Sequence, residues 1–327
     1  MKICAIDTGS NSVRLLQWED GRSLNKKIRT TRLGEGLAAT GRLGAAAMER
    51  TAEAIADFAA EARAWGAERL YVFATAAARR AENGADFVRL VRDKYGIAVD
   101  VISGEEEARL GLLGALGGED GGIIDVGGAS SEVTVGKGGK IVYGKSLDLG
   151  AVRLTEMCGG DRQKTQRAIE KRLSAYGTIP KTAMTAIGGT ATSVVALEKE
   201  LAVYDPRQVH GTVLSTACVR GWADRLLSMT QAERLALPGM DPRRADILGG
   251  GALLLAMIAE YAGAAAMTVS EADNLEGYIA AKCADGEMPS SGFADEKCEK
   301  LHAAADSAAR ERENGSFASG TSDEADI

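Results

Sequence analysis

The fold of this chain is best understood from the stretch Ile123-Ile124-Asp125-Val126-Gly127-Gly128-Ala129-Ser130-Ser131-Glu132. Its apolar start predicts a buried strand, its glycines and serines predict a tight turn, and a second strand is expected from Glu132. Glycines let a backbone approach a ligand closely, and exposed N–H groups in such a turn bind phosphate oxygens. Asp125 is placed to hold a hydrated Mg²⁺ at the strand end. The alternative is a hairpin whose glycines only form the turn.

The N-terminal segment repeats this pattern. Residues 2–7 predict a buried strand ending at Asp7, residues 8–12 predict a turn, and residues 13–18 predict the second strand of a hairpin. Asp7-x-Gly9-Ser10 corresponds to Asp125-x-Gly127-Gly128. The repeat indicates two related halves, each offering a phosphate-binding turn, with two unrelated hairpins as the alternative.

Composition sets limits on the class of protein. The chain has 327 residues, of which 45% are hydrophobic and 26% charged, which predicts a globular protein of two domains. The net charge is −7, so the chain lacks the excess of basic residues that is typical of a nucleic-acid-binding protein. The five scattered cysteines predict reduced thiols and a cytoplasmic location. The longest apolar run, residues 247–259, is shorter than the ~20 residues of a membrane span, so no membrane association is expected.

Strands and helices alternate after each hairpin. Helices are expected at residues 43–65, 84–95, 161–175, 214–229, 243–263 and 275–283, and strands at 70–74, 98–103, 140–147, 182–187 and 267–270. The alternation predicts two α/β domains of similar construction with a cleft between them. A third glycine turn, Gly188-Gly189-Thr190, opens a helix after a strand, which suits either an anion site or tight helix packing.

Asp7 and Asp125 are expected to face each other across that cleft. Such an arrangement suits phosphate chemistry, because turns bind phosphate oxygens, a metal offsets charge, and a carboxylate orients or deprotonates water. His210 and His302 are the only histidines, which leaves carboxylates as the acid–base groups. The Glu105-Glu106-Glu107 triplet opens a predicted helix, where favourable interaction with the helix dipole is the alternative explanation.

Six segments together resemble the exopolyphosphatase / guanosine pentaphosphate phosphatase (Ppx/GppA) family, within the actin–Hsp70–sugar kinase superfamily. They lie at residues 5–12, 74–83, 102–109, 125–132, 149–154 and 188–192. The resemblance implies an α/β fold of two ribonuclease H-like (actin-like ATPase) domains, each a mixed five-stranded sheet flanked by helices, with an interdomain cleft. Domain I is expected at residues 1–119 and domain II at 120–283. A helix at about 284–311 is expected to pack back on domain I, and residues 312–327 are expected to be a disordered tail.

The resemblance also implies roles for individual residues. Glu107 falls on the family's catalytic acid, and Glu132 on a second acid that binds metal and water. Asp125, Glu132 and Asp7 are the implied ligands of Mg²⁺, with Mn²⁺ as the alternative metal. The implied phosphate-binding residues are Asp7, Gly9, Ser10, Asn11, Ser12, Arg79, Gly127, Gly128, Ser130, Gly188, Gly189 and Thr190.

The implied reaction is hydrolysis of a terminal phosphoanhydride bond in inorganic polyphosphate or pppGpp, releasing orthophosphate. The chain departs from the family pattern at Ala129, where a third glycine is usual, and in Glu271–Gly277, where an arginine is usual. If position 129 needs a positive φ, alanine is unfavourable there. These departures motivate a second hypothesis, a sensor of (p)ppGpp or polyphosphate without turnover. A sugar or acid kinase of the same superfamily is the third, and the sequence leaves homodimer formation open.

Overall fold

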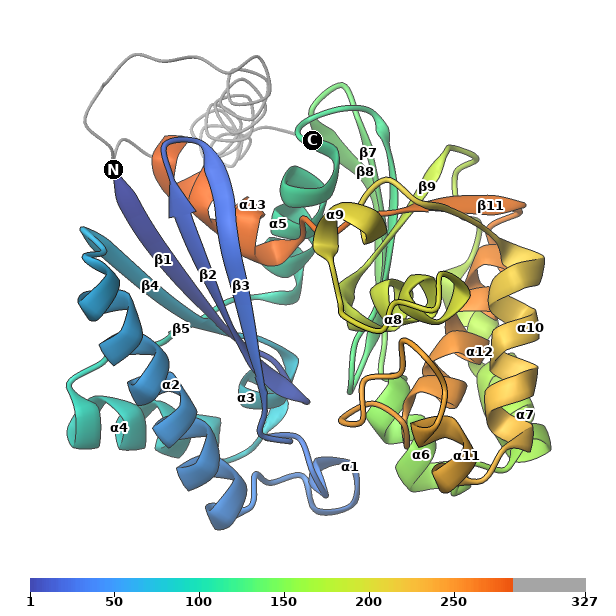
Figure 1. The fold of residues 1–327 in the computed structure, drawn as a ribbon, viewed down its shortest axis with the longest axis horizontal. Helices are drawn as coiled ribbons and strands as arrows, with labels where there is room; N and C mark the ends of the chain where they lie inside the picture. Colours follow the sequence, from blue (N-terminus) through green and yellow to red (C-terminus); the bar gives the residue numbers. More distant parts are fainter. Residues whose placement is uncertain (285–327) are drawn as a thin grey trace, which may run out of the picture.

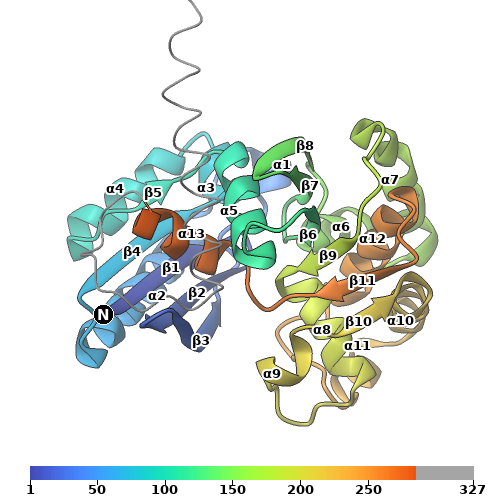
Figure 2. The same ribbon diagram turned by 90° about the horizontal axis from the view of Figure 1, so that it is seen from above.

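The computed structural model describes residues 1–284, which form two α/β units side by side (Figure 1). The helix expected up to residue 311 and the tail expected at 312–327 therefore lie outside the described residues, apart from residue 284. Each unit contains one mixed sheet with helices packed against it, and the view from above separates the two sheets clearly (Figure 2).

The first sheet has five strands in the order β3-β2-β1-β4-β5. Its central strand β1 is buried because Ile3, Cys4, Ala5 and Ile6 are all apolar. β1 pairs antiparallel with β2 and parallel with β4, so the sheet is mixed as expected. The strands are β1 (Lys2–Thr8), β2 (Ser12–Glu19), β3 (Arg22–Thr30), β4 (Arg69–Ala74) and β5 (Asp100–Val101).

The second sheet has six strands in the order β10-β11-β9-β6-β7-β8, one more than expected. The extra strand is β10, whose last two residues we had assigned to the start of the helix expected at 214–229. Central β6 pairs antiparallel with β7 and parallel with β9, as β1 does with β2 and β4. The strands are β6 (Gly121–Val126), β7 (Ser131–Lys137), β8 (Lys140–Leu147), β9 (Met184–Ile187), β10 (Val213–Ser215) and β11 (Ala266–Val269).

Helices cover both sheets (Figure 1). In the first unit and at its border they are α1 (Leu37–Thr40), α2 (Ala45–Trp65), α3 (Ala76–Arg80), α4 (Gly84–Tyr95) and α5 (Gly104–Leu116). The remaining helices are α6 (Ala151–Cys158), α7 (Arg162–Leu173), the 3-10 helix η1 (Ser174–Tyr176), α8 (Gly188–Glu198), α9 (Pro206–Val209), α10 (Thr216–Ser228), α11 (Gln231–Leu235), α12 (Leu248–Tyr261) and α13 (Asn274–Lys282).

Two hydrophobic cores sandwich the first sheet. One contains residues of α2 and α4, and the other contains residues of α5 and α13. α13 follows β11 of the second sheet, so the chain returns to the first unit at α13, before the segment that we expected to do so. The division into residues 1–119 and 120–283 stays a prediction, while the packing of α13 assigns Leu275 and Ile279 to the core beside β1.

The apolar run at residues 247–259 contributes α12, which is buried along most of its length in the core of the second unit. Among residues 1–284, no helix combines the length and apolar character needed to cross a membrane. β3 was not expected, because its exposed edge carries Arg22, Lys26, Lys27 and Arg29 and lacks apolar alternation.

Candidate functional site

The two predicted hairpins have the same local structure. Gly9 donates its backbone N–H to the carbonyl of Ser12 at 3.0 Å, and Gly127 donates to Ser130 at the same distance. A Cβ on either glycine would make ordinary or slightly tight contact with that same serine carbonyl. The internal repeat read from the sequence is therefore a structural repeat.

In each turn, carbonyl groups accept hydrogen bonds from backbone N–H groups of a neighbouring segment. In the first turn, Asn11 accepts from the N–H groups of Thr31 and Arg32 at 3.0 and 2.9 Å. In the second turn, the carbonyls of Gly127 and Gly128 accept from the first residues of α6 at 2.9–3.2 Å. Within the described chain the N–H groups of Ser10, Asn11, Gly128 and Ala129 find no acceptor. Each turn thus keeps donors available for an anion.

The two turns line one pocket between the units, with about 740 Å³ of empty space. They lie close together, because a Cβ on Gly128 would stand 3.4 Å from the Cβ atoms of Ser10 and Asn11. All predicted site residues except Arg79 line this pocket. Their assembly from four segments confirms that the turns share a site, while their individual roles stay predictions.

Glu107 enters the pocket from the first turn of α5. Ser103 caps this helix by accepting from the N–H of Glu106 at 3.0 Å, and Glu106 itself pairs with Arg109. Glu107 is 13% exposed, and its Oε2 accepts from Arg79 at 2.9 Å. Burial, and next the charge of Glu132, raises the pKa of Glu107 to about 7, although Arg79 opposes the shift. Glu107 is therefore suited to exchange protons near neutral pH.

Arg79, a predicted phosphate ligand, contacts Glu107 in this structure, and its contact with phosphate stays a prediction. Besides Glu107, its Nη1 donates to the carbonyl of Ile102 at 2.9 Å. It does not line the pocket itself.

Asp125 and Glu132 lie directly opposite each other on β6 and β7. Burial, followed by the charge of Glu132, raises the pKa of Asp125 well above its ordinary value. Burial also raises the pKa of Glu132, and hydrogen bonds from Ser146 and Ser130 oppose this. The Ser146 hydroxyl donates to Glu132 at 2.7 Å. Two acids placed opposite each other favour binding of a positive ion.

The donor set fits a hydrated Mg²⁺. Within residues 1–284, no three Asp, Glu, His or Cys side chains converge as a metal-chelating group. Mg²⁺ needs fewer protein ligands, since it keeps several waters and binds through one or two carboxylates and substrate phosphates. Asp125 and Glu132 supply such carboxylates, and the buried Oδ1 of Asp7 has no hydrogen-bond partner.

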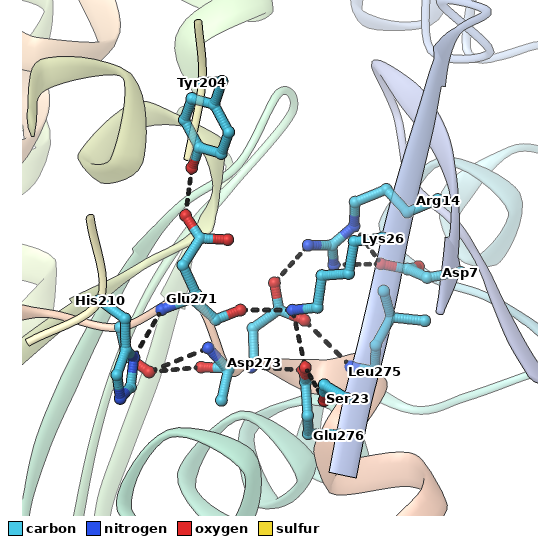
Figure 3. A network of polar contacts seen from close by, with 12 residues as sticks. Asp7, Arg14, Ser23, Lys26, Tyr204, His210, Glu271, Asp273, Leu275 and Glu276 are labelled. Atoms are coloured by element: carbon cyan, nitrogen blue, oxygen red, sulfur yellow. Dashed lines mark hydrogen bonds and ion pairs between the residues drawn. The ribbon is translucent and has the colours of Figure 1, made fainter. Parts of the chain in front are cut away.

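Asp7 has a different partner from Asp125. Opposite Asp7 on β2 stands Arg14, whose guanidinium pairs with both Asp7 and Asp273 (Figure 3). Burial raises the pKa of the Asp7 carboxyl, and Arg14 opposes the shift. For Asp273, burial alone would raise the pKa, but Arg14 and Lys26 outweigh it and lower the pKa. Arg14 thus connects the first turn to the connector between β11 and α13.

The segment Glu271–Gly277, which departs from the family pattern, has a clear structural role. Asp273 caps α13 by accepting from Leu275 N–H at 3.0 Å, and Glu276 accepts from Asp273 N–H at 3.0 Å. Lys26 of β3 pairs with Glu276 at 2.9 Å and also contacts the Glu271 carbonyl (Figure 3). Leu275 is fully buried beside β1, so a charged side chain at this position would have to be buried.

The third glycine turn makes room for two charged side chains. A Cβ on Gly188, whose φ is +79°, would stand 2.6 Å from the Asp125 carboxylate. A Cβ on Gly189 would overlap the guanidinium of Arg244. The Thr190 hydroxyl donates to the carbonyl of Val126 at 2.9 Å, so its proton is already used within the fold. This turn supports the tight-packing interpretation, and its contact with phosphate stays a prediction.

Four polar residues that line the pocket were not among the predicted site residues: Arg14, Thr75, Arg244 and Asn274. Arg244 forms no ion pair or side-chain hydrogen bond with a described residue, and burial lowers its pKa. An arginine between Val13 and Leu15 in a buried strand was a usable signal for Arg14. Nothing local marks Arg244 or Asn274, because only the fold brings them to the pocket.

The backbone at Ala129 is not strained, although the family usually has a glycine at this position. Asp20, Arg32 and Glu200 are the non-glycine residues with positive φ in residues 1–284, and Ala129 is not among them. The concern that this position needs a left-handed backbone is therefore wrong. Ala129 is 8% exposed and lines the pocket.

Comparison with known proteins places this site in context. The model of the Ppx/GppA phosphatase family matches residues 18–284. Exopolyphosphatase 2 of Mycobacterium tuberculosis is 37% identical over 309 residues, covering 84% of this chain and 97% of the relative. Guanosine-5'-triphosphate,3'-diphosphate pyrophosphatase of Photobacterium profundum is 29% identical, covering 84% of this chain and 58% of that protein.

Solved structures agree with the sequence comparison. The crystal structure of the Aquifex aeolicus member of the Ppx/GppA family is 30% identical and superimposes with a TM-score of 0.73. The match covers 88% of this chain and 99% of that one. The similarity therefore extends over most of the described chain.

Proposed function

The chain belongs to the Ppx/GppA phosphatase family, and from that premise we propose that it hydrolyses terminal phosphoanhydride bonds and releases orthophosphate. The substrates that we propose are inorganic polyphosphate and pppGpp, the two classes suggested by the names of its relatives. The observation that carries the proposal is the pair of matching turns, whose free N–H groups share a pocket with buried acids.

The turns would bind the terminal phosphates. Backbone N–H groups of Ser10, Asn11, Gly128 and Ala129 have no acceptor in the described chain, and such fixed donors bind anionic oxygens well. The Asn11 side-chain amide is buried without a partner and lines the same pocket. Arg244 adds a positive charge that lines the pocket and forms no ion pair within residues 1–284.

Asp125 and Glu132 would hold a hydrated Mg²⁺, with the free oxygen of Asp7 as a further donor. When bound there, the ion would offset the charge of both the acids and the substrate phosphates. Mn²⁺ offers similar chemistry to the same oxygen donors.

Glu107 would act as the general base. A water molecule attacks the terminal phosphorus, and its proton passes to the Glu107 carboxylate while the bridging oxygen leaves with the shortened substrate. Arg79 holds one Glu107 oxygen at 2.9 Å and thereby orients the other. A pKa of about 7 suits this role, because the group is both ionised and basic near neutral pH.

A substrate panel tests the activity directly. We expect the full chain to release phosphate from polyphosphates of several lengths or from pppGpp when Mg²⁺ or Mn²⁺ is present. Release of phosphate from none of them, with either metal, would refute the proposal. Tight (p)ppGpp or polyphosphate binding without release would instead identify a sensor, and ATP-dependent phosphorylation of a small acceptor would identify a kinase.

Glu107→Ala tests the mechanism. We expect turnover to fall by about 10²–10⁴-fold, the usual contribution of a general base, with the circular dichroism spectrum unchanged. Glu105→Ala is the matched control, because Glu105 lies in the same helical turn but is exposed and does not line the pocket. An unchanged kcat in Glu107→Ala would exclude the assigned role.

A further inference from the structure

Asp273 lies next to the candidate site, in the connector between β11 and α13 (Figure 3). Its side chain is 7% exposed and does not line the pocket itself. It pairs with the guanidinium of Arg14. Arg14 does line the pocket, together with the implied metal ligands Asp7, Asp125 and Glu132. Asp273 can therefore influence the site through the position of Arg14 and through its own charge.

Arg14 divides its hydrogen-bond donors between two acids. Its Nε donates to Oδ2 of Asp7 at 3.1 Å, and its Nη2 donates to the same oxygen. Its Nη1 donates to Oδ2 of Asp273. The other carboxylate oxygen of Asp7, Oδ1, is buried and has no hydrogen-bond partner in the described part of the chain. Arg14 thus occupies one oxygen of Asp7 and leaves the other available.

The start of α13 fixes the position of Asp273. Its Oδ1 accepts from the N–H of Leu275 at 3.0 Å, and its own N–H donates to Glu276 at 3.0 Å. Helix α5 packs closely against this connector, since a Cβ on Gly114 would stand 1.9 Å from the Asp273 carbonyl oxygen. Oδ1 of Asp273 is therefore committed to the helix, and the backbone holds Oδ2 in place for Arg14.

The shared arginine leaves a negative charge beside the second hairpin. Two acids share one guanidinium, so Asp7, Arg14 and Asp273 together keep one negative charge when all three are ionised. After burial and Glu132, which raise it, the pKa of Asp125 responds to two further charges. Arg14 lowers this pKa, and Asp273 raises it. Without Asp273, the charge of Arg14 would be less opposed at Asp125, and its freed N–H group would need a new acceptor in a pocket lined by acids.

We infer that Asp273 is a positioning residue for the candidate metal site. By holding Arg14 and offsetting its charge, Asp273 prevents the guanidinium from competing with a cation for Asp7 and Asp125. The inference rests on the proposed function, in which these acids hold Mg²⁺. The alternative role of Asp273 is to cap α13 alone. A cap needs a hydrogen-bond acceptor but no charge, so the two roles can be separated by substitution.

Binding of Mn²⁺ to the full chain without substrate tests the inference, measured by the loss of the electron paramagnetic resonance signal of free Mn²⁺. At pH 8, we expect Asp273→Asn to weaken Mn²⁺ binding by about tenfold, because it removes a charge close to the site. Asparagine and serine cap helices about as well as aspartate, so Asp273→Ser should give a similar loss. Asp273→Glu keeps the charge and should bind Mn²⁺ within about threefold of the wild type.

Glu276→Gln is the matched control. It removes one negative charge from the same helix start, where Glu276 pairs with Lys26 at 2.9 Å and, within residues 1–284, forms no ion pair with Arg14. We expect its Mn²⁺ affinity to stay within about twofold of the wild type, because its charge is balanced by Lys26. In phosphate-release assays, Asp273→Asn should raise the Mg²⁺ concentration for half-maximal rate about tenfold and keep kcat at saturating Mg²⁺ within about threefold.

Wild-type Mn²⁺ affinity in the folded neutral variants of Asp273 overturns the inference, because Asp273 would then only cap the helix. An equal loss of affinity in Glu276→Gln also overturns it, because any nearby charge would have the same effect. Absence of Mn²⁺ binding to the wild-type chain would refute the proposed metal site together with this inference. The expected changes in Mn²⁺ binding without any phosphate release would support the inference and refute the proposed activity, so the two failures are distinguished.

Discussion

The glycine turns of the two hairpins have the same backbone hydrogen bond, but the residues opposite their acids differ in charge. In the first hairpin, the residue opposite Asp7 is Arg14, and in the second, the residue opposite Asp125 is Glu132. The first acid is therefore neutralised within the protein, and only 6% of its side chain is exposed. The second acid faces another acid, which raises its pKa beyond the effect of burial alone.

This difference assigns different tasks to equivalent positions. Arg14 ties Asp7 to Asp273, so the first hairpin is anchored to the connector that leads into α13. The second hairpin keeps two acids opposite each other, and protonation or binding of a cation would relieve their repulsion. We interpret the first turn as the rigid wall of the pocket and the second as its metal-binding wall.

Asp125→Asn and Asp7→Asn provide the strongest test of this comparison. We expect Asp125→Asn to reduce activity by at least about 100-fold and to leave the unfolding free energy at pH 8 unchanged or higher, because it relieves repulsion. Asp7→Asn should lower the unfolding free energy by roughly 1–3 kcal/mol, since Arg14 keeps only Asp273. Denaturant titration measures both changes. Equal losses of stability in the two variants would mean that the charge difference has no effect.

The pH dependence of kcat/KM tests whether Glu107 acts as the base and whether the charge of Glu132 raises its pKa. We expect kcat/KM to rise about tenfold per pH unit below the pKa of about 7 and to level off above it, as Glu107 loses its proton. Because the charge of Glu132 contributes to this pKa, the carboxyl NMR titration of Glu107 should move to lower pH in Glu132→Gln. A titration that stays in place would contradict the coupling.

Mg²⁺ should stabilise the protein more at pH 8 than at pH 6. The pKa values of Asp125, Glu132 and Glu107 are raised in the folded chain, so the stability they contribute is complete at low pH. That stability is lost as pH rises through the folded pKa values. A bound cation offsets the charge of these acids and thereby restores the lost stability. At about 2–4 °C per kcal/mol, we expect a rise in Tm of a few degrees. Asp125→Asn is the control, and it should reduce the Mg²⁺ effect at pH 8.

Ala129→Gly should have the smallest effect. Ala129 does not adopt a positive φ, so the turn does not need the backbone freedom that a glycine would add. We expect activity within about twofold of the wild type and a loss of about 0.5–1 kcal/mol in unfolding free energy from added chain entropy. A severalfold rise in activity would show that alanine at this position does restrict phosphate binding.

Much of the site could be predicted from local sequence. An apolar run, an acid and a glycine-rich turn fix the position of Asp7 and Asp125 at strand ends, because strand alternation and turn chemistry act over a few residues. For Glu107 the local sequence indicated only a helix start at Ser103 and the acids that follow, and its role in the site came from the family resemblance.

Other features lack a local signal. Arg14 and Asp273 are 259 positions apart, and only the return of α13 to the first sheet brings them together. β3 was missed because an edge strand with one exposed face needs charged residues rather than apolar alternation. Arg244 reaches the pocket only because Gly189 lacks a side chain in its path.

By itself, the sequence determined the two hairpins, the acids at their strand ends and the glycines of their turns, because these depend on short-range backbone preferences and burial. The tertiary structure decided which acid has a cation opposite it, which arginine contacts Glu107, and that Arg244 reaches the pocket. These depend on charges that approach only after two sheets and a returning helix pack together. At short distance and low exposure, such pairings control the pKa values on which the proposed chemistry depends.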